Sequence, residues 1–304
     1  LSGDKVKLSM DGNQLINYSI EKGSLNSLIE NNHAINANNG AVILSSEGKD
    51  EVLSSVINNK GTIKAKGITK QGGKIFLSSK KGKIKNSGTM VASSEVSVGG
   101  KIEVTGDHIK LKTGSIINVT GKTGGGQALV GGSWQNSDAS VRQAVTAQVE
   151  HGAVLDASAT VNGDGGEIVV WSDITDPQSL TAVAGSLWAR GGSEGGDGGA
   201  IETSGFVLDI AGIDVQTSAI SGENGLWLLD PYDYTIGSIE AEYIVDALGD
   251  QNNVTISTAS STSTAGSNTI SAASDDDPDG GTITVDAEID LMCPSGPCGD
   301  LTLT

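Results

Sequence analysis

The stretch that decides the fold lies between residues 161 and 231, where one short pattern occurs three times. It reads VNGDGGEIVVW (161–171), GGDGGAIET (195–203) and GLWLLDP (225–231), so that each time a glycine turn precedes a short strand. A second turn and strand lie between these copies, at GAVLDA (152–157), GSLWA (185–189) and GIDVQ (212–216). This alternation predicts that the chain winds repeatedly round the same corners.

The pattern extends towards the N-terminus with a regular spacing. The second turn type has its glycine at positions 61, 88, 114, 152, 185 and 212, and His33 fits the same place one period earlier. The longer intervals fall at the same places in both series, which indicates insertions within a common winding. A repeat of this size is typical of a solenoid. The last glycine of the first turn type recurs every 26 to 40 residues, as Gly40, Gly73, Gly100, Gly126, Gly166, Gly199 and Gly225.

A third short strand precedes several of the second-type turns. It occurs at KIK (83–85), HIKL (108–111) and FVLDI (206–210). About three strands per coil of roughly 27 residues predict an all-β, triangular parallel β-helix whose inward side chains form apolar ladders. We expect this β-helix to occupy residues 1–229.

The rhythm breaks after Leu229. Apolar spacing predicts one short helix over 239–248, with Ser238 as its N-cap and Gly249 as its stop. Strands are expected again at 253–257 and 281–285, with an acidic loop between them. We therefore expect residues 230–304 to form a looser continuation of the β-helix with an inserted helix.

Composition limits the function classes. No run of 18 apolar residues is present, so we expect no membrane-spanning helix, and the polar start of the sequence leads us to expect no signal peptide. Charge is divided unevenly: residues 1–122 hold 17 Lys against 10 acidic residues, whereas 123–304 hold 2 Arg against 27. Surface solubility is the favoured explanation, and attraction between rod ends, or to an anionic surface, is the alternative. The acidic balance disfavours nucleic-acid binding.

The segment 132–150 lengthens one coil. We expect it to form a loop on one face, where binding groups of solenoids commonly lie. A plain surface excursion with Trp134 folded back onto the coil is the favoured alternative.

No catalytic site is evident, although many parallel β-helices are polysaccharide lyases or hydrolases. Glu167, Glu202, Asp209 and Asp214 alternate with apolar residues, so we expect them to be solvated outward positions. None of the three histidines accompanies a Ser or Cys nucleophile in a recognisable motif. We therefore expect no enzymatic activity and no cofactor.

Two further features concern metal and disulfide chemistry. Cys293 and Cys298 enclose a Pro-Ser-Gly-Pro turn, which places them for a local disulfide in a secreted chain. Four carboxylates could hold a calcium ion weakly, although a solvated acidic loop is the favoured interpretation. They are Asp275, Asp276, Asp277 and Asp279.

An ordered set of motifs resembles a known family. The set comprises NGDGG (162–166) with IVVWSD (168–173), ARGG (189–192) with GGDGG (195–199) and ETSG (202–205), and LWLLDP (226–231) with YTI (234–236). These are similar to the region after the secretion domain in filamentous-haemagglutinin-like exoproteins (TpsA) of two-partner secretion systems. The resemblance implies a right-handed parallel β-helix, export through the periplasm of a Gram-negative bacterium and a partner pore in its outer membrane, and a cell-surface rod used in adhesion.

The resemblance has limits. The family's secretion domain, with its Asn-Pro-Asn-Gly turn, is not found in this sequence, so we expect that the chain does not direct its own export. We interpret the chain as a structural and adhesive segment whose partners are surface glycans or proteins and the secretion pore. A subunit that polymerises end to end with itself is the alternative, and a polysaccharide-acting enzyme is the third.

Overall fold

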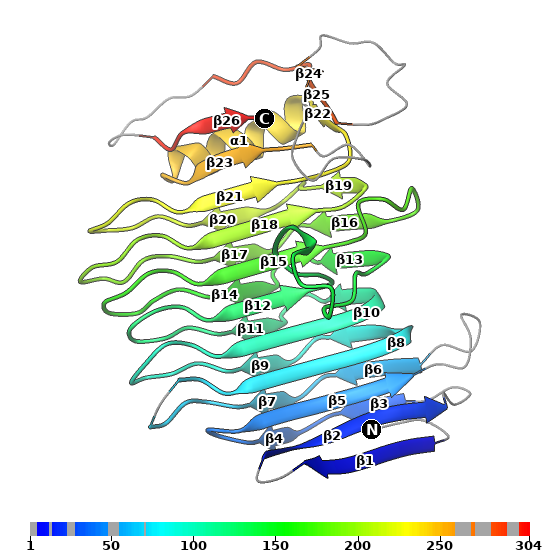
Figure 1. The fold of residues 1–304 in the computed structure, drawn as a ribbon. Coiled ribbons are helices and arrows are strands. Elements are labelled where there is room, and N and C mark those ends of the chain that lie inside the picture. The colour runs from blue at the N-terminus through cyan, green and yellow to red at the C-terminus, as the bar shows by residue number, and fades with distance from the viewer. Residues whose placement is uncertain are drawn as a thin grey trace.

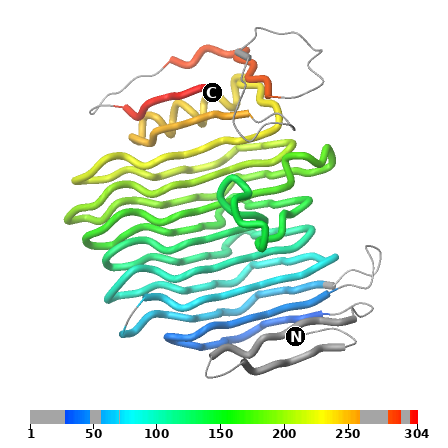
Figure 2. The backbone as a smooth tube through the Cα atoms, viewed as in Figure 1, coloured from blue at the N-terminus to red at the C-terminus, as the bar shows by residue number. Residues whose placement is uncertain are grey.

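The computed structural model describes residues 5–11, 14–22, 28–47, 55–69, 71–258, 269–270, 281–290 and 298–304. Short strands stack in successive coils, and the chain advances along one axis as it winds (Figures 1 and 2). Neighbouring coils pair in parallel, so the predicted parallel β-helix is confirmed. Most coils contribute strands to three faces.

The first face carries the strands that follow the first type of glycine turn. Two of them, β8 and β10, are long enough to continue round a corner into the second face. Its strands are β5 (Ala41–Glu47), β8 (Lys74–Asn86), β10 (Lys101–Leu111), β12 (Gln127–Val130), β15 (Glu167–Trp171), β18 (Ala200–Ser204), β21 (Leu226–Leu229), β23 (Asn253–Ile256) and β26 (Leu301–Leu303).

The other two faces complete the triangle. Besides the ends of β8 and β10, the second face holds β3 (Leu28–Asn31), β6 (Ser55–Asn59), β13 (Thr146–Val149), β16 (Leu180–Val183) and β19 (Val207–Asp209). The third face holds β4 (Ala34–Asn36), β7 (Thr62–Lys64), β9 (Thr89–Val91), β11 (Ile116–Asn118), β14 (Val154–Asp156), β17 (Ser186–Trp188) and β20 (Asp214–Gln216).

Inward side chains form ladders because the first-face strands keep the same register from coil to coil. On the first face the second residue of each strand from β8 to β23 points inward and is fully buried. Each buried Ile or Val side chain contributes roughly 1.5–3 kcal/mol of hydrophobic stabilisation. This ladder consists of Ile75, Ile102, Ala128, Ile168, Ile201, Trp227 and Val254.

A second, polar ladder lies inside the corner that ends the second face. Asn31 donates from Nδ2 to Oδ1 of Asn59 at 2.7 Å, and Asn59 donates in the same way to Asn86 at 2.7 Å. Asn86 then donates to the carbonyl of Gly88 at 3.1 Å. All three asparagines are buried, and stacking lets each amide satisfy its neighbour.

The structure shortens the predicted insertion. Residues 146–149 form β13, which pairs with β10 and β16 in the second face, so they belong to the coil itself. The inserted part is the segment 131–145, called here the 131–145 loop, which contains the short 3-10 helix η1 (Trp134–Asn136). It lies over the first face in front of β12 and β15 (Figure 2).

The predicted helix is confirmed as α1 (Ser238–Gly249), although its N-cap is Gly237 rather than Ser238. Glu240 accepts a hydrogen bond from the Gly237 N–H at 3.1 Å, and this contact fixes the first turn one residue earlier than expected. Ala241, Ile244 and Leu248 are buried. In this coil α1 occupies the place of a third-face strand.

The described segments beyond α1 partly resume the winding. Strand β23 pairs with β21 and β26, which continues the first face. A separate three-stranded parallel sheet contains β22 (Tyr234–Ile236), β25 (Thr282–Val285) and β24 (Thr269–Ile270). At the other end of the chain, β1 (Lys5–Asp11) and β2 (Gln14–Lys22) form an antiparallel hairpin, a pairing that the sequence pattern did not predict.

Candidate functional site

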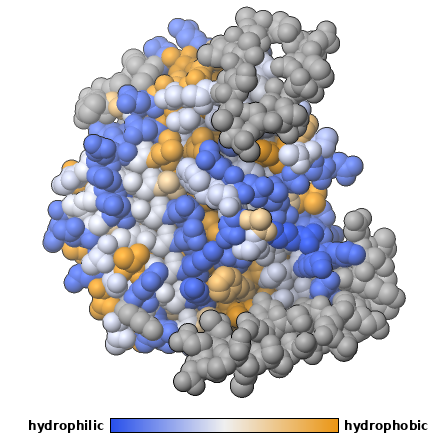
Figure 3. All heavy atoms as spheres, in the orientation of Figure 1, coloured by the Kyte–Doolittle hydropathy of each residue, from blue (hydrophilic) through white to orange (hydrophobic). Residues whose placement is uncertain are grey.

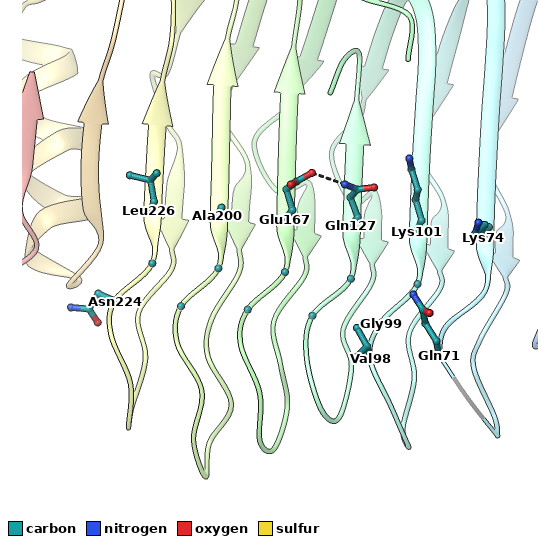
Figure 4. A pocket seen from close by; sticks show the side chains of 18 of the residues that line it. Gln71, Lys74, Val98, Gly99, Lys101, Gln127, Glu167, Ala200, Asn224 and Leu226 are labelled. Carbon is teal, nitrogen blue, oxygen red and sulfur yellow. Dashed lines mark hydrogen bonds between the residues drawn. The ribbon is translucent and has the colours of Figure 1, made fainter. Parts of the chain in front are cut away.

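A long groove follows the corner between the third and first faces. It has a volume of about 880 Å³ and crosses the coils that contain β8, β10, β12, β15, β18, β21 and β23. Its floor is the backbone of glycine pairs that stand directly before the first-face strands (Figure 4). Because the groove runs along the axis, one ligand could contact several coils.

The structure places the seven turn glycines in one column, called here the glycine column. A Cβ added to Gly126 would lie 2.2 Å from the carbonyl oxygen of Gly100, and one added to Gly100 would lie 2.1 Å from that of Gly73. The same carbonyls accept hydrogen bonds from the next coil, as Gly100 does from the Gln127 N–H at 2.9 Å. All of these glycines except Gly40 are therefore required by close approach to the preceding coil, and none of the seven has a left-handed φ.

The other glycine of each pair packs in the opposite direction. A Cβ on Gly99 would lie 1.8 Å from the carbonyl oxygen of Val119, which belongs to the following coil. Gly165 is related in the same way to Ala189, at 2.0 Å. The two positions together exclude side chains from the floor, which leaves partly exposed polar backbone in the groove at Gly125, Gly165 and Gly198, whereas Gly99 is buried.

One wall of the groove is a row of side chains that directly follow the glycine pairs, called here the outer row. Gln127 donates from Nε2 to Oε1 of Glu167 at 2.6 Å within this wall (Figure 4), and the Lys101 ammonium lies 3.0 Å from the Glu103 carboxylate. Along the axis the outer row changes from cationic to polar and anionic, then to apolar, and ends on a polar asparagine. Its members are Lys74, Lys101, Gln127, Glu167, Ala200, Leu226 and Asn253.

A second feature lies beneath the 131–145 loop. Outward side chains of β12 and β15 form a small apolar cluster with the loop, and it contains Leu129, Val141, Val169 and Trp171. The Trp171 indole donates to Oε1 of Gln143 at 2.9 Å, and Trp134 packs against the cluster. Trp134 therefore folds back onto the coil as expected. The loop also buries outward side chains of β12 and β15 on the first face.

The loop covers Glu202, which corrects the expectation that this residue is solvated. Its side chain is on the outer side of β18 yet fully buried. Oε2 accepts a hydrogen bond from the Gln135 N–H at 2.8 Å, and Oε1 accepts one from Ser204 Oγ at 3.1 Å. Burial raises the pKa of Glu202 from the ordinary 4.5 to about 8, helped by the negative charges of Asp230 and Glu167.

Asp230 is a second buried carboxyl near this place. It follows β21 and is 6% exposed, and its Oδ1 has no hydrogen-bond partner among the described residues. Burial raises the pKa of Asp230 to about 6. The two carboxyl groups therefore favour the protonated state at pH values where exposed carboxylates are ionised.

The remaining predicted residues are not gathered into a site. Glu167 lines the groove, Asp209 is exposed, and Asp214 accepts a hydrogen bond from the Trp188 indole at 3.0 Å. Asp275, Asp276, Asp277 and Asp279 lie outside the described residues. Cys293 also lies outside them, so its disulfide with Cys298 stays a prediction. Among the residues described, no cluster of three or more His, Cys, Asp or Glu is placed to hold a metal ion.

Sequence reasoning missed the groove and the buried state of Glu202. The glycine pairs signalled the groove, because two adjacent positions without side chains leave a bare strip along a stacked fold. For Glu202 the signal was the insertion that precedes it, although nothing in the local sequence tells which outward position the insertion covers. The described part of the chain contains no helix with the length and apolar character of a membrane span.

Comparison with known proteins adds a structural relationship. No protein-family model and no curated protein sequence matches the chain. Among solved structures, the chain is similar to the crystal structure of the HMW1 secretion domain from Haemophilus influenzae, with a TM-score of 0.60 and 27% sequence identity. The match covers 75% of this chain and 55% of the HMW1 chain. This neighbour is itself a secretion domain, and the expected position of our chain after such a domain stays a prediction.

Proposed function

We propose that this chain is a β-helical rod segment of a secreted bacterial exoprotein of the two-partner secretion kind, with an adhesive role at the cell surface. The observation that carries the proposal is the in-register β-helix together with its likeness to the HMW1 secretion domain. Export would then require an outer-membrane partner pore. The motifs that resemble filamentous-haemagglutinin-like exoproteins support the same assignment.

The build of the rod suits a structural role. Coils that share backbone hydrogen bonds and buried ladders transmit load along the axis, and each coil packs only on its neighbours. The face seen in Figure 3 is largely hydrophilic, with smaller apolar groups scattered between. Such a surface suits a protein that is displayed in water and binds through a limited site.

Export and adhesion can be tested separately. For export, the chain is fused behind a two-partner secretion domain and expressed with and without the matching pore; we expect it in the medium or on the surface only when the pore is present. For adhesion, beads that carry the purified chain are compared with albumin-coated beads on epithelial and bacterial cells. Equal attachment of both bead types would contradict the adhesive role.

A filament subunit is the second candidate, and the lengthwise division of charge favours it. Basic residues are concentrated in the early coils and acidic residues in the later ones, so that opposite ends of two rods attract. Electron microscopy at high protein concentration separates the two functions. Long end-to-end filaments would support the function as a filament subunit. Single rods would support the function as a rod segment of an exoprotein.

We also propose that the chain acts without catalysis. The groove wall contains one carboxylate, Glu167, which is already bonded to Gln127, whereas glycoside hydrolysis uses a pair of carboxyl groups. Incubation with a panel of acidic and neutral glycans should release no new reducing ends. Turnover of any of them would favour the enzyme instead.

A further inference from the structure

The floor of the groove contains a row of backbone carbonyl groups that are free to accept hydrogen bonds. They belong to the first residue of each pair before a first-face strand. Within the described part of the chain, the carbonyls of Gly99, Gly125, Gly165 and Gly198 accept no hydrogen bond. The N–H groups of these glycines donate hydrogen bonds, as Gly125 does to the Asp164 carbonyl at 2.9 Å. Each of these glycines therefore has a carbonyl acceptor left for a ligand and no N–H donor.

The last coil of the groove shows what kind of group these carbonyls bind. Asn224 is the counterpart of the first glycine in its pair, and its carbonyl oxygen accepts a hydrogen bond from Nδ2 of Asn253 at 2.9 Å. Asn253 is a member of the outer row and is paired in register with Leu226. A donor that lies in the groove therefore reaches this carbonyl. Because the same backbone hydrogen bonds recur in each coil, the corresponding carbonyls of the earlier coils point in the same direction.

The spacing of the row selects the kind of ligand. Neighbouring coils are about 4.8 Å apart, so the row offers one acceptor about every 4.8 Å along the axis. An extended peptide presents N–H groups on one side only about every 6.7 Å, which does not match. A hexose ring in an extended chain is close to one coil in length, and its hydroxyl groups are hydrogen-bond donors.

We propose that the groove binds an extended, hydroxyl-rich polysaccharide along the axis of the β-helix, with about one sugar ring per coil. Hydroxyl groups donate to the carbonyl row. Gln127 and Glu167 bond further hydroxyls, and the apolar side chains of Ala200 and Leu226 cover the C–H face of a ring. The inference rests on the proposed adhesive function, for which it names the ligand class.

The coil with Asn253 supplies the design of a test. Leu226→Asn puts an amide at the matching place one coil earlier, where it can donate to the Gly198 carbonyl and block that position from within. Leu226→Ala is the matched control because it shortens the same side chain without supplying a donor. Circular dichroism and thermal unfolding verify that both variants keep the fold.

Titration calorimetry with cellohexaose and chitohexaose, which are extended, and maltohexaose, which is coiled, measures binding. We expect at least one extended hexamer to bind and maltohexaose to bind at least tenfold more weakly. Leu226→Asn should lower the affinity at least tenfold relative to Leu226→Ala, which loses only the apolar contact with the ring. Absence of binding by both extended hexamers, or equal affinity of the Leu226→Asn variant, would overturn the inference.

The bead assay keeps the two proposals apart. If coated beads attach to cells but no extended hexamer binds, the adhesive function stands and the groove inference fails. If a hexamer binds and Leu226→Asn abolishes this binding while the beads do not attach, the groove binds saccharide and the adhesive role fails. Preferential binding of an extended Ser/Asn peptide at the same groove would also overturn the inference.

Discussion

Gly126 illustrates how a single residue limits the whole stack. Its α-carbon lies so close to the coil below that an added Cβ would meet backbone atoms of Gly99 and Gly100 at 2.8 and 2.2 Å. Backbone atoms cannot rotate away as a side chain does, so neighbouring coils would have to separate. Gly249, at the end of α1, has no atom within 4 Å of such a Cβ.

We therefore expect the same substitution to have opposite effects at these two positions. Gly126→Ala should lower the free energy of unfolding by at least about 2 kcal/mol, as overpacking does. Gly249→Ala should leave it unchanged or raise it by up to about 1 kcal/mol, because alanine favours the helix. Urea unfolding followed by circular dichroism measures both. A Gly126→Ala variant as stable as the native chain would show that coil contact does not require glycine.

Glu202 makes stability depend on pH. Its pKa is about 8 in the folded chain and near 4.5 when exposed, so the folded state holds an additional proton between these values. The stability associated with this proton is fully present below about pH 4.5 and is lost as pH rises to about 8. Asp230 acts with the same sign between 3.8 and about 6.

Glu202→Gln tests this dependence because glutamine keeps a similar shape and an acceptor for the Gln135 N–H. From pH 6 to 8 the native chain should lose stability, by an amount on the order of a few kcal/mol, and the variant should lose much less. Urea midpoints at several pH values measure the difference. Asp230→Asn is the matched control, because its effect on stability is expected at lower pH, between 3.8 and about 6. Parallel pH curves for native chain and Glu202→Gln would contradict the assignment.

At the scale of elements, α1 packs at the end of the third face, and one side chain, Asn252, connects the helix to that face. Asn252 is fully buried and accepts hydrogen bonds at Oδ1 from the N–H and the hydroxyl group of Thr217. Its Nδ2 donates to the carbonyls of Val215 at 3.0 Å and Ala247 at 2.6 Å. The Asn252 side chain thus connects Val215 in β20 and the following Thr217 with the end of the helix.

Asn252→Ala should loosen this end of the rod and leave distant coils intact. The substitution leaves buried polar groups without partners, which costs about 1–3 kcal/mol for each such group. Coils contact only their neighbours, so hydrogen exchange should become faster in α1 and β23 and remain unchanged in β8 and β10. Asn162→Ala, at an exposed position, is the control. Faster exchange throughout the chain would indicate a single cooperative unit instead.

At the scale of the whole molecule, the order of coils converts a sequence asymmetry into a spatial one. The described part of the chain advances along the axis from blue to red in Figure 1, so its residues up to 122 and those from 123 onward occupy different lengths of the rod. The first part holds 17 Lys against 10 acidic residues and the second 2 Arg against 27. We expect a rod with this distribution to attract the opposite end of a second copy.

Association between rods should therefore depend on salt. We expect larger assemblies at about 10 mM ionic strength, where the Debye length is about 30 Å, than at about 1 M, where it is about 3 Å. Sedimentation velocity at both salt concentrations measures the size distribution. Assemblies of the same size under both conditions would exclude electrostatic attraction as their cause.

Much of the winding could be read from the sequence because each coil packs on its neighbours through equivalent residues. Gly73, Gly100 and Gly126 hold the same place in successive coils, and the period of their spacing is the period of the fold. Inward ladders and glycine contacts are local properties of each repeat. The helix at 239–248 was predictable for a similar reason, since its apolar spacing lies within a single short segment.

Other features could be decided only by the tertiary structure. Glu202 occupies an outward strand position, and its burial depends on Gln135, which lies 67 residues earlier in the chain. Asn252 finds Thr217 at a separation of 35 residues, and the hairpin of β1 and β2 departs from the parallel pattern. A repeat determines how neighbouring coils stack. Desolvation and the pairing of polar groups depend on which distant segment covers them, and only the folded chain determines that.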